Sequence, residues 1–260
     1  MRRLGVDETS TRRGQRYVTL FHDADARRLL FATPGRDAAT FAAFTADLYT
    51  HGGQAGQITD ISMDMSQAFQ SGARQQPPQA QLTFDPFHVV ALAGKALDQV
   101  CRAEVKGEPD LKGACWALRK RAENWSPDQI TQMHWLQRST LKTARAWRLK
   151  ETLQSIYEVR PPAEEAERLF LRWISWARRS RLPAFKQLAA SYKAPLAGIV
   201  EHFRNGLSNG FVEAMNAQIQ AAKARAKGYA TDRNLIAIAY LLCAKLRHLP
   251  KHPWTVPDRA

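Results

Sequence analysis

The sequence is poor in cysteine and has no long apolar run. Its three cysteines, Cys101, Cys115 and Cys243, are far apart and form no CxxC pair, so neither a zinc ribbon nor a disulfide framework is expected and a reducing compartment is the default. No stretch of about 18 uninterrupted apolar residues occurs, which argues against a membrane span. The first residues, MRRLGVDETSTRRG, lack the apolar segment of a secretory signal. These absences predict a cytoplasmic protein with no membrane partner.

Acidic residues are scarce relative to basic ones. The 260 residues include 38 Lys and Arg against 24 Asp and Glu, a net charge of +14. Residues 1–90 hold equal numbers of basic and acidic residues, so the whole positive surplus comes from residues 91–260. A basic surplus of this size favours a polyanionic partner, most simply nucleic acid. The alternative is that the charge serves solubility alone.

The first third of the chain predicts a small sheet with helices. Hydrophobic residues make up 45% of the chain, which is enough for a core. Runs of β-branched and aromatic residues between turn signals predict strands, and helical periodicity predicts helices. The strands are expected over 3–8, 16–21, 27–32 and 57–64 and at the end of 76–84, and the helices over 37–52 and 65–74. The order βββαβαβ predicts an α/β fold with a ribonuclease H-like mixed five-stranded sheet flanked by helices.

Beyond Asp85 only helical periodicity remains. A long amphipathic helix is expected over 86–105, and prolines break the pattern that follows up to about residue 205. The tryptophans gathered in this region are expected to form a core of their own. The predicted domains are residues 1–105 as the first part of the core, 106–205 as a large all-helical insertion, and 206–250 as C-terminal helices that complete the core. In the last part, Ser208 or Asn209 and Thr231 are candidate helix caps, and Gly228 is a candidate helix stop.

Three acidic residues lie where phosphodiester chemistry would need them. Asp7 is expected at the end of the first strand, Asp64 at the end of the fourth, and Glu213 early in a C-terminal helix. Neighbouring strand ends can place two carboxylates together, and Mg²⁺ prefers such oxygen ligands. The alternatives are a solvated strand end for Asp7, a helix cap for Asp64 and a helix-dipole acid for Glu213. Asp85, with His88 one turn later, is expected near the site as a supporting acid.

The helix that carries Glu213 has a polar face. Glu213 is followed at steps of three and four by Asn216, Gln220, Lys223 and Lys227. Lysines and amides on one helix face can contact phosphate, sugar or base edges, so these four residues are candidate DNA-binding residues. An ordinary amphipathic surface helix is the alternative.

Five motifs in order resemble a known family. They are GVDETSTRRGQRYVTLF, ISMDMSQAF, FDPFHVVALAGKALDQV, AWRLKETLQSIY and LSNGFVEAMNAQIQAAKARAKGY. Together they resemble the DDE catalytic domain of the ISL-three group of insertion-sequence transposases, from Val6 to about Ala239. The resemblance implies that Asp7, Asp64 and Glu213 are both the catalytic residues and the ligands of two Mg²⁺ ions, which Mn²⁺ could replace. It also implies cleavage at transposon ends, strand transfer to target DNA, a homo-oligomer on DNA, and a bacterial protein associated with the nucleoid.

Two departures from the family pattern keep alternatives open. Relatives carry a zinc-binding segment and a helix-turn-helix before this domain, and here the sequence begins almost at Asp7, which suggests a truncated element. The glutamate motif usually continues with Gly, where this chain has Ala214. An active transposase domain is therefore weighed against a non-catalytic DNA-binding fragment that modulates a full-length transposase. A junction-resolving nuclease of the same fold is disfavoured, because a small nuclease needs no large helical insertion.

Overall fold

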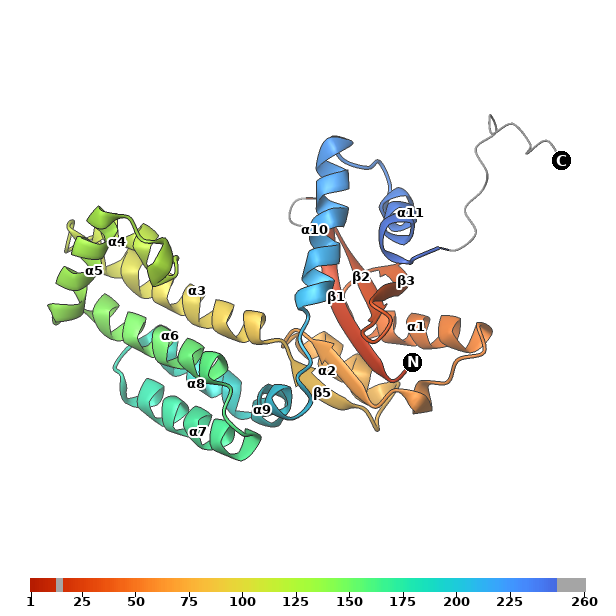
Figure 1. Cartoon of the computed structure of the whole chain (residues 1–260), viewed down its shortest axis with the longest axis horizontal. Helices are drawn as coiled ribbons and strands as arrows, with labels where there is room; N and C mark the ends of the chain where they lie inside the picture. The colour runs from red at the N-terminus through yellow and green to blue at the C-terminus, as the bar shows by residue number, and fades with distance from the viewer. Residues whose placement is uncertain (13–15, 247–260) are drawn as a thin grey trace. The chain divides into compact units, whose positions relative to one another are not determined.

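The computed structural model describes residues 1–12 and 16–246 (Figure 1). By its internal contacts the chain divides into two compact units, Met1–Ala80 with Asn209–Ala260 and Gln81–Ser208. The first unit is therefore built from two segments that are distant in the sequence, and the second from one continuous segment. None of the helices in the described ranges is both long and apolar enough to cross a membrane.

The sheet has five strands in the order β3-β2-β1-β4-β5. The strands are β1 (Arg3–Arg12), β2 (Arg16–Asp23), β3 (Arg28–Pro34), β4 (Asp60–Met63) and β5 (Gln81–Phe84). Strands β1, β2 and β3 form an antiparallel meander, whereas β4 runs parallel to β1. This mixed α/β arrangement confirms the predicted ribonuclease H-like fold class. The fourth strand is shorter than predicted, because Ala55–Gln57 form a 3₁₀ turn, η1, before it.

Aromatic side chains join the sheet to helices α1 (Ala39–Thr50) and α2 (Gln67–Gln75). Phe21 on β2 stacks on Phe44 with 4.5 Å between ring centroids and meets Phe41 edge-on at 5.1 Å. Phe41 in turn contacts Phe69 of α2. Such ring pairs add about 0.5–1.5 kcal/mol beyond the burial of their area, so this cluster fixes how α1 and α2 pack against the strands.

A second apolar cluster joins the sheet to α10 (Gly210–Arg225) and α11 (Asp232–Cys243). Its buried members from the strands include Val18, Leu20 and Leu29, and those from the helices include Ile219 and Leu235. Thr231 caps α11 as predicted, because its side chain accepts a hydrogen bond from the Asn234 backbone N–H. The last residues of the described chain thus complete the core that the first residues begin.

The second unit contains seven helices between β5 and Ser208. They are α3 (Pro86–Glu104), α4 (Leu111–Ala117), α5 (Pro127–Arg138), α6 (Lys142–Val159), α7 (Ala163–Arg179), α8 (Pro183–Lys193) and α9 (Leu196–Asn205), with a 3₁₀ turn η2 (Ala122–Asn124). Prolines open α3, α5 and α8, where the missing N–H costs nothing. Figure 1 shows α3 running beside α6.

Only part of the predicted aromatic core of this unit is buried. Trp173 is 2% exposed and donates a hydrogen bond from Nε1 to the Leu149 carbonyl at 2.7 Å. Trp116, Trp135 and Trp176 are instead exposed by 67%, 40% and 39%. Helical periodicity predicts that all of these tryptophans lie in the core. A tryptophan is easily buried, however, only where its indole N–H has a hydrogen-bond partner.

The expectation that the cysteines form no disulfide is wrong. Cys101 near the end of α3 is joined to Cys115 of α4, and Cys243 is a free, buried thiol. The chain turns back between α3 and α4, and the two Cα atoms lie 6.8 Å apart. Sequence spacing could not show this, because a separation of 14 residues is neither a CxxC motif nor a recognisable framework.

The contact-based units begin and end at different residues from the predicted domains. The whole of α3 belongs to the helical unit because it packs along α6 and α8. The division of the chain into a core at 1–105, an insertion at 106–205 and C-terminal helices at 206–250 remains a proposal about how the family's core was interrupted.

Candidate active site on the first strand

A series of polar side chains ties α10 and the residue before it to β1. Every bond in this series joins the C-terminal segment to the first ten residues or so of the chain. The pairs are Asn209 Nδ2 to Val6 O (3.0 Å), Asn216 Nδ2 to Asp7 Oδ2 (2.6 Å), Gln220 Nε2 to Thr9 Oγ1 (2.6 Å) and Lys223 Nζ to Ser10 O (2.7 Å). Because both residue numbers rise together, α10 runs in the same general direction as β1.

Gly5 allows this helix to approach the strand closely. A Cβ atom at Gly5 would lie 2.9 Å from Val212 Cγ2 and 3.5 Å from the Phe211 ring. The first contact is shorter than real Cβ atoms tolerate, so any larger residue would push the start of α10 away from the sheet. Glycine at this position therefore sets the distance between the first turn of α10 and the strand that carries Asp7.

Asp7 lies in the middle of β1 and not at its end, which corrects the sequence-based expectation. The strand continues to Arg12 because the β1–β2 hairpin is longer than predicted. Asp7 is 8% exposed. Its Oδ1 accepts from the Glu8 backbone N–H at 2.8 Å and its Oδ2 accepts from Asn216. A carboxylate so held has one fixed rotamer, which suits a ligand or a reactant that must be positioned.

Asp64 immediately follows β4 in the chain. Leu4 pairs with Ile61 and Gly5 with Ser62 in the parallel β1–β4 ladder. Continuing that register by two residues brings Asp64 opposite Asp7 and onto the same face, on strands about 4.8 Å apart. Asp64 Oδ1 accepts from the Ser66 backbone N–H at 2.9 Å. Ser66, and not Asp64, is the N-cap residue of α2.

Glu213 occupies the first turn of α10. It precedes Asn216 by three residues, so the two side chains lie on one face of the helix with Cβ atoms about 5–6 Å apart. Asn216 is bonded to Asp7, so this face of α10 is directed at the aspartate strand. All three predicted acids thus belong to the first unit, and Glu213 lies on the helix face that carries Asn216, the hydrogen-bond partner of Asp7. Their convergence on one metal site remains a prediction.

Three of the four candidate DNA-binding residues contact the protein's own first strand. Asn216, Gln220 and Lys223 direct donors onto β1, as the pairs above show. Lys227 follows the helix in a left-handed conformation with φ of 54°. Asn216, Gln220 and Lys223 lie on one face as predicted, whereas Lys227 lies beyond the end of α10. Periodicity alone could not tell whether that face meets DNA or the protein's own sheet. Their contact with DNA remains a prediction.

Asn216 also presents an unused oxygen. Its Oδ1 is shielded from solvent and accepts no hydrogen bond from residues 1–12 or 16–246. The reverse amide orientation would place Oδ1 against the Asp7 carboxylate, so the assigned orientation is the favourable one. A buried amide oxygen beside a carboxylate is a natural acceptor for a water molecule that a bound cation would orient.

Asp85 and His88 belong to the start of α3 in the helical unit. The Asp85 side chain caps the helix by accepting from the His88 backbone N–H, and its Oδ2 lies 3.3 Å from His88 Nδ1. Asp85 is 2% exposed. Helix capping therefore explains why an acid stands before Pro86, and a supporting role for these residues at the metal site remains a prediction.

Comparisons with known proteins agree on one family. The family model for DDE transposases of the ISL3 group, described as "Transposase", matches residues 4–239. The chain belongs to this transposase family. It is 35% identical to the transposase for insertion sequence element IS1557 of Mycobacterium tuberculosis, in two strains, over 97% of this chain and 62% of the relative. It is 29% identical to the transposase for insertion sequence element IS1001 of Bordetella parapertussis, over 87% of this chain and 57% of the relative.

These comparisons have two limits that bear on function. The chain spans about three-fifths of the length of the curated relatives that it matches. No solved structure matches the chain significantly. Family membership is therefore shown by sequence over nearly the whole chain, while the geometry of the site comes from the present structure.

Sequence reasoning missed two features of the candidate site. One is the contact of Asn209 with the Val6 carbonyl, and the other is the role of Thr9 and Ser10 as partners of α10. Asn209 offers the only usable signal, because an Asn-Gly pair before a helix points to a cap. Here the cap residue makes no side-chain capping bond and turns to the strand instead.

Proposed function

We propose that this chain is the catalytic domain of an insertion-sequence transposase, in which Asp7, Asp64 and Glu213 hold two divalent cations. The observation that carries the proposal is the Asn216–Asp7 hydrogen bond, which holds the Glu213 face of α10 against the strand of Asp7. The β1–β4 register supplies Asp64 on the neighbouring strand. Family membership supports the assignment of these three acids.

The donor set fits Mg²⁺. Three carboxylates offer hard oxygen ligands, and Mg²⁺ is commonly held by one or two carboxylates with water and substrate phosphate completing its shell. The shielded Asn216 Oδ1 could accept a hydrogen bond from such a water. Mn²⁺ accepts the same ligands.

The reaction replaces one P–O bond of a DNA phosphodiester with another, giving a phosphomonoester in hydrolysis and a new phosphodiester in strand transfer. The attacking oxygen belongs to water in hydrolysis and to a DNA 3′-hydroxyl in strand transfer. It forms a new bond to phosphorus while the bond to the leaving oxygen breaks, and the leaving oxygen ends with a proton. Two bound cations would supply activation of the attacking oxygen and stabilisation of the leaving one.

The chain's own residues position these groups. Asn216 and the Glu8 backbone N–H fix both oxygens of Asp7, so this ligand needs no reorganisation when the substrate binds. Gly5 keeps α10 close enough for Glu213 to share the site. The basic surplus of residues 91–260 would hold the DNA backbone. Transposon ends and target DNA are the proposed substrates, and a homo-oligomer assembled on DNA is the proposed active form.

The test uses conservative changes that remove charge and keep shape. Asp7→Asn, Asp64→Asn and Glu213→Gln should each abolish metal-dependent DNA cleavage, and also strand transfer from pre-cleaved element ends, in Mg²⁺ and in Mn²⁺. DNA binding should be unchanged or tighter, because a negative charge near the phosphates is lost. Asp60→Asn, at the opposite end of β4, is the matched control and should retain activity.

A second candidate is a DNA-binding fragment that modulates a full-length transposase. It needs only the basic surplus of residues 91–260 as a DNA-binding surface and requires no metal site. An unmodified chain without metal-dependent activity that binds DNA as well as its three acid variants would make this candidate the better one.

A further inference from the structure

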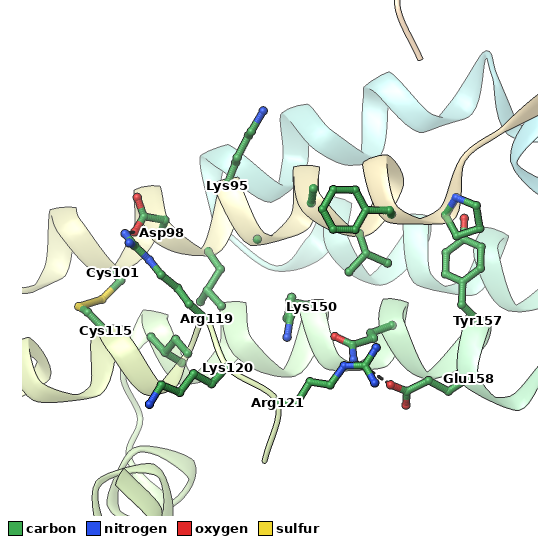
Figure 2. A pocket seen from close by; sticks show the side chains of 18 of the residues that line it. Lys95, Asp98, Cys101, Cys115, Arg119, Lys120, Arg121, Lys150, Tyr157 and Glu158 are labelled. Carbon is green, nitrogen blue, oxygen red and sulfur yellow. Dashed lines mark hydrogen bonds and ion pairs between the residues drawn. A yellow bond between two sulfur atoms is a disulfide. The ribbon is translucent and has the colours of Figure 1, made fainter. Parts of the chain in front are cut away.

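The helical unit contains a large open cavity that the carboxylate site does not use. It has a volume of about 1040 Å³ and lies between α3, α6 and the segment that follows α4. This is at the upper end of the range for small-molecule sites, about 300–1,000 Å³. Figure 2 shows its lining, with the Cys101–Cys115 disulfide at one end and Tyr157 at the other.

One part of the lining is apolar and aromatic. Phe87, Val90 and Leu97 come from α3, Leu118 follows α4, and Tyr157 lies near the end of α6. The Phe87 ring is 62% exposed. An aromatic ring left this open at the edge of a cavity offers a flat surface on which another ring can stack.

The rest of the lining is strongly basic. Six cationic side chains line the cavity, against the two acids Asp98 and Glu158: Lys95, Arg119, Lys120, Arg121, Lys150 and Arg160. One of those acids is already engaged, because Asp98 forms ion pairs with Arg102 and Arg119. The cavity therefore has a positive potential that favours an anion.

Lys150 is the most informative of these cations. Its residue is only 9% exposed, and its Nζ donates to Glu151 Oε1 at 2.7 Å. Figure 2 shows it amid the lining residues, between α3 and the Arg119–Arg121 segment. Burying an ammonium group is costly unless it is paired. Glu151 already pairs with Lys150, and a phosphate in the cavity would give the ammonium group a second anionic partner.

We propose that this cavity binds a nucleoside phosphate, with its phosphate at Lys150 and the Arg119–Arg121 segment and its base against Phe87. Cationic walls combined with aromatic platforms are how proteins hold unpaired nucleotides. A paired base in a duplex presents no free face for such stacking. The same chemistry is offered by a free nucleotide and by an unpaired nucleotide of a DNA strand. The proposal does not depend on the acids of the first unit.

Gly94 of α3 provides a way to block the cavity without disturbing the fold. It lines the cavity, and a Cβ atom added there would meet nothing within 4 Å. Gly94→Leu would therefore extend into the empty space, and leucine favours a helix more than glycine does. Gly94→Ala is the matched control, because it improves the helix equally while leaving the cavity open.

The test measures binding in EDTA, so that the carboxylate site plays no part. The probes are deoxyadenosine 5′-monophosphate by calorimetry and a short fluorescein-labelled oligodeoxyadenylate by anisotropy, with its duplex for comparison. We expect Gly94→Leu and Lys150→Met to weaken single-strand binding at least tenfold, with little effect on the duplex. Gly94→Ala and Lys186→Met, which removes an exposed lysine on α8, should behave as the unmodified chain.

The outcomes separate the two sources of ligand. If the oligonucleotide binds and the monophosphate does not, the ligand is an unpaired nucleotide of a strand. If only the monophosphate binds and Gly94→Leu abolishes it, the ligand is a free nucleotide. Unchanged binding of both probes to Gly94→Leu would overturn the proposal, as would equal losses for single strand and duplex. Loss of catalysis in the acid variants with this binding intact would leave the cavity assignment standing.

Discussion

The Asn216–Asp7 contact allows a direct test of how α10 supports the aspartate strand. Asn216→Ala removes a hydrogen bond to a largely buried carboxylate, and a bond to a charged group contributes about 1.5–3 kcal/mol. Asn216→Asp removes the same bond and adds a second negative charge near Asp7. Two charges about 4 Å apart interact by about 4 kcal/mol at an effective dielectric constant of 20. In EDTA we therefore expect Asn216→Ala to lose about 2 kcal/mol of unfolding free energy and Asn216→Asp to lose clearly more.

Divalent cations should reduce the difference in unfolding free energy between these two variants. The added carboxylate of Asn216→Asp would lie where the proposed cations bind, so Mg²⁺ or Mn²⁺ should stabilise this variant more than it stabilises Asn216→Ala. A ligand at 100 times its dissociation constant adds about 2.7 kcal/mol of stability. Urea unfolding of both variants, in EDTA and in millimolar Mn²⁺, measures the effect.

The control is Asn234→Asp, an exposed position in the first turn of α11. An acid there is favoured by the helix dipole, so this variant should be as stable as the unmodified chain and indifferent to Mn²⁺. Equal stabilities of Asn216→Ala and Asn216→Asp in EDTA, or identical responses to Mn²⁺, would refute the reasoning about this contact.

Three further predictions concern stability. Burial lowers the pKa of His22 from 6.5 to about 4, and a hydrogen bond with the Gly5 backbone partly opposes this shift. Because the unfolded chain binds a proton that the folded chain does not, the free energy of unfolding should fall by about 3 kcal/mol as the pH drops from 6.5 to 4. Urea titrations at several pH values should show a weaker pH dependence for His22→Leu. Gly5→Val should cost about 1–3 kcal/mol through overpacking against Val212, measured by thermal unfolding, whereas an unchanged melting temperature would contradict the close approach of α10. Reducing the Cys101–Cys115 disulfide should cost up to about 3 kcal/mol, as for a closed loop of about 15 residues, and a Cys101→Ser variant should then show no response to reductant.

The sequence predicted the sheet better than it predicted the use of its polar residues. The βββαβαβ order followed from local patterns, since each strand and helix there carries its own periodicity and turn residues. The face of α10 that contains Glu213, Asn216 and Gln220 also followed from local spacing. What that face contacts is β1, more than 200 residues away, and no local pattern carries such information.

The helical unit shows the same limit more strongly. Prolines correctly indicated where α5 and α8 begin, because proline acts on its own neighbours. The disulfide and the basic cavity depend on how α3 lies against α4 and α6, which is a property of packing between helices. The buried position of Lys150 was equally hidden, because a lysine in a helical pattern is ordinarily assigned to the surface.

The sequence separation between Asp7 and its partner on α10 has a consequence for synthesis. Asn216 follows Asp7 by 209 residues, an interval that a ribosome adding about 5–20 residues per second needs roughly 10–40 s to cover. Residues 81–208, being continuous, can fold during that interval, whereas the aspartate strand must wait for the C-terminal segment. A nascent chain that ends before α10 therefore lacks Glu213 and the hydrogen bond from Asn216 to Asp7, so the proposed metal site cannot form until α10 has been synthesised.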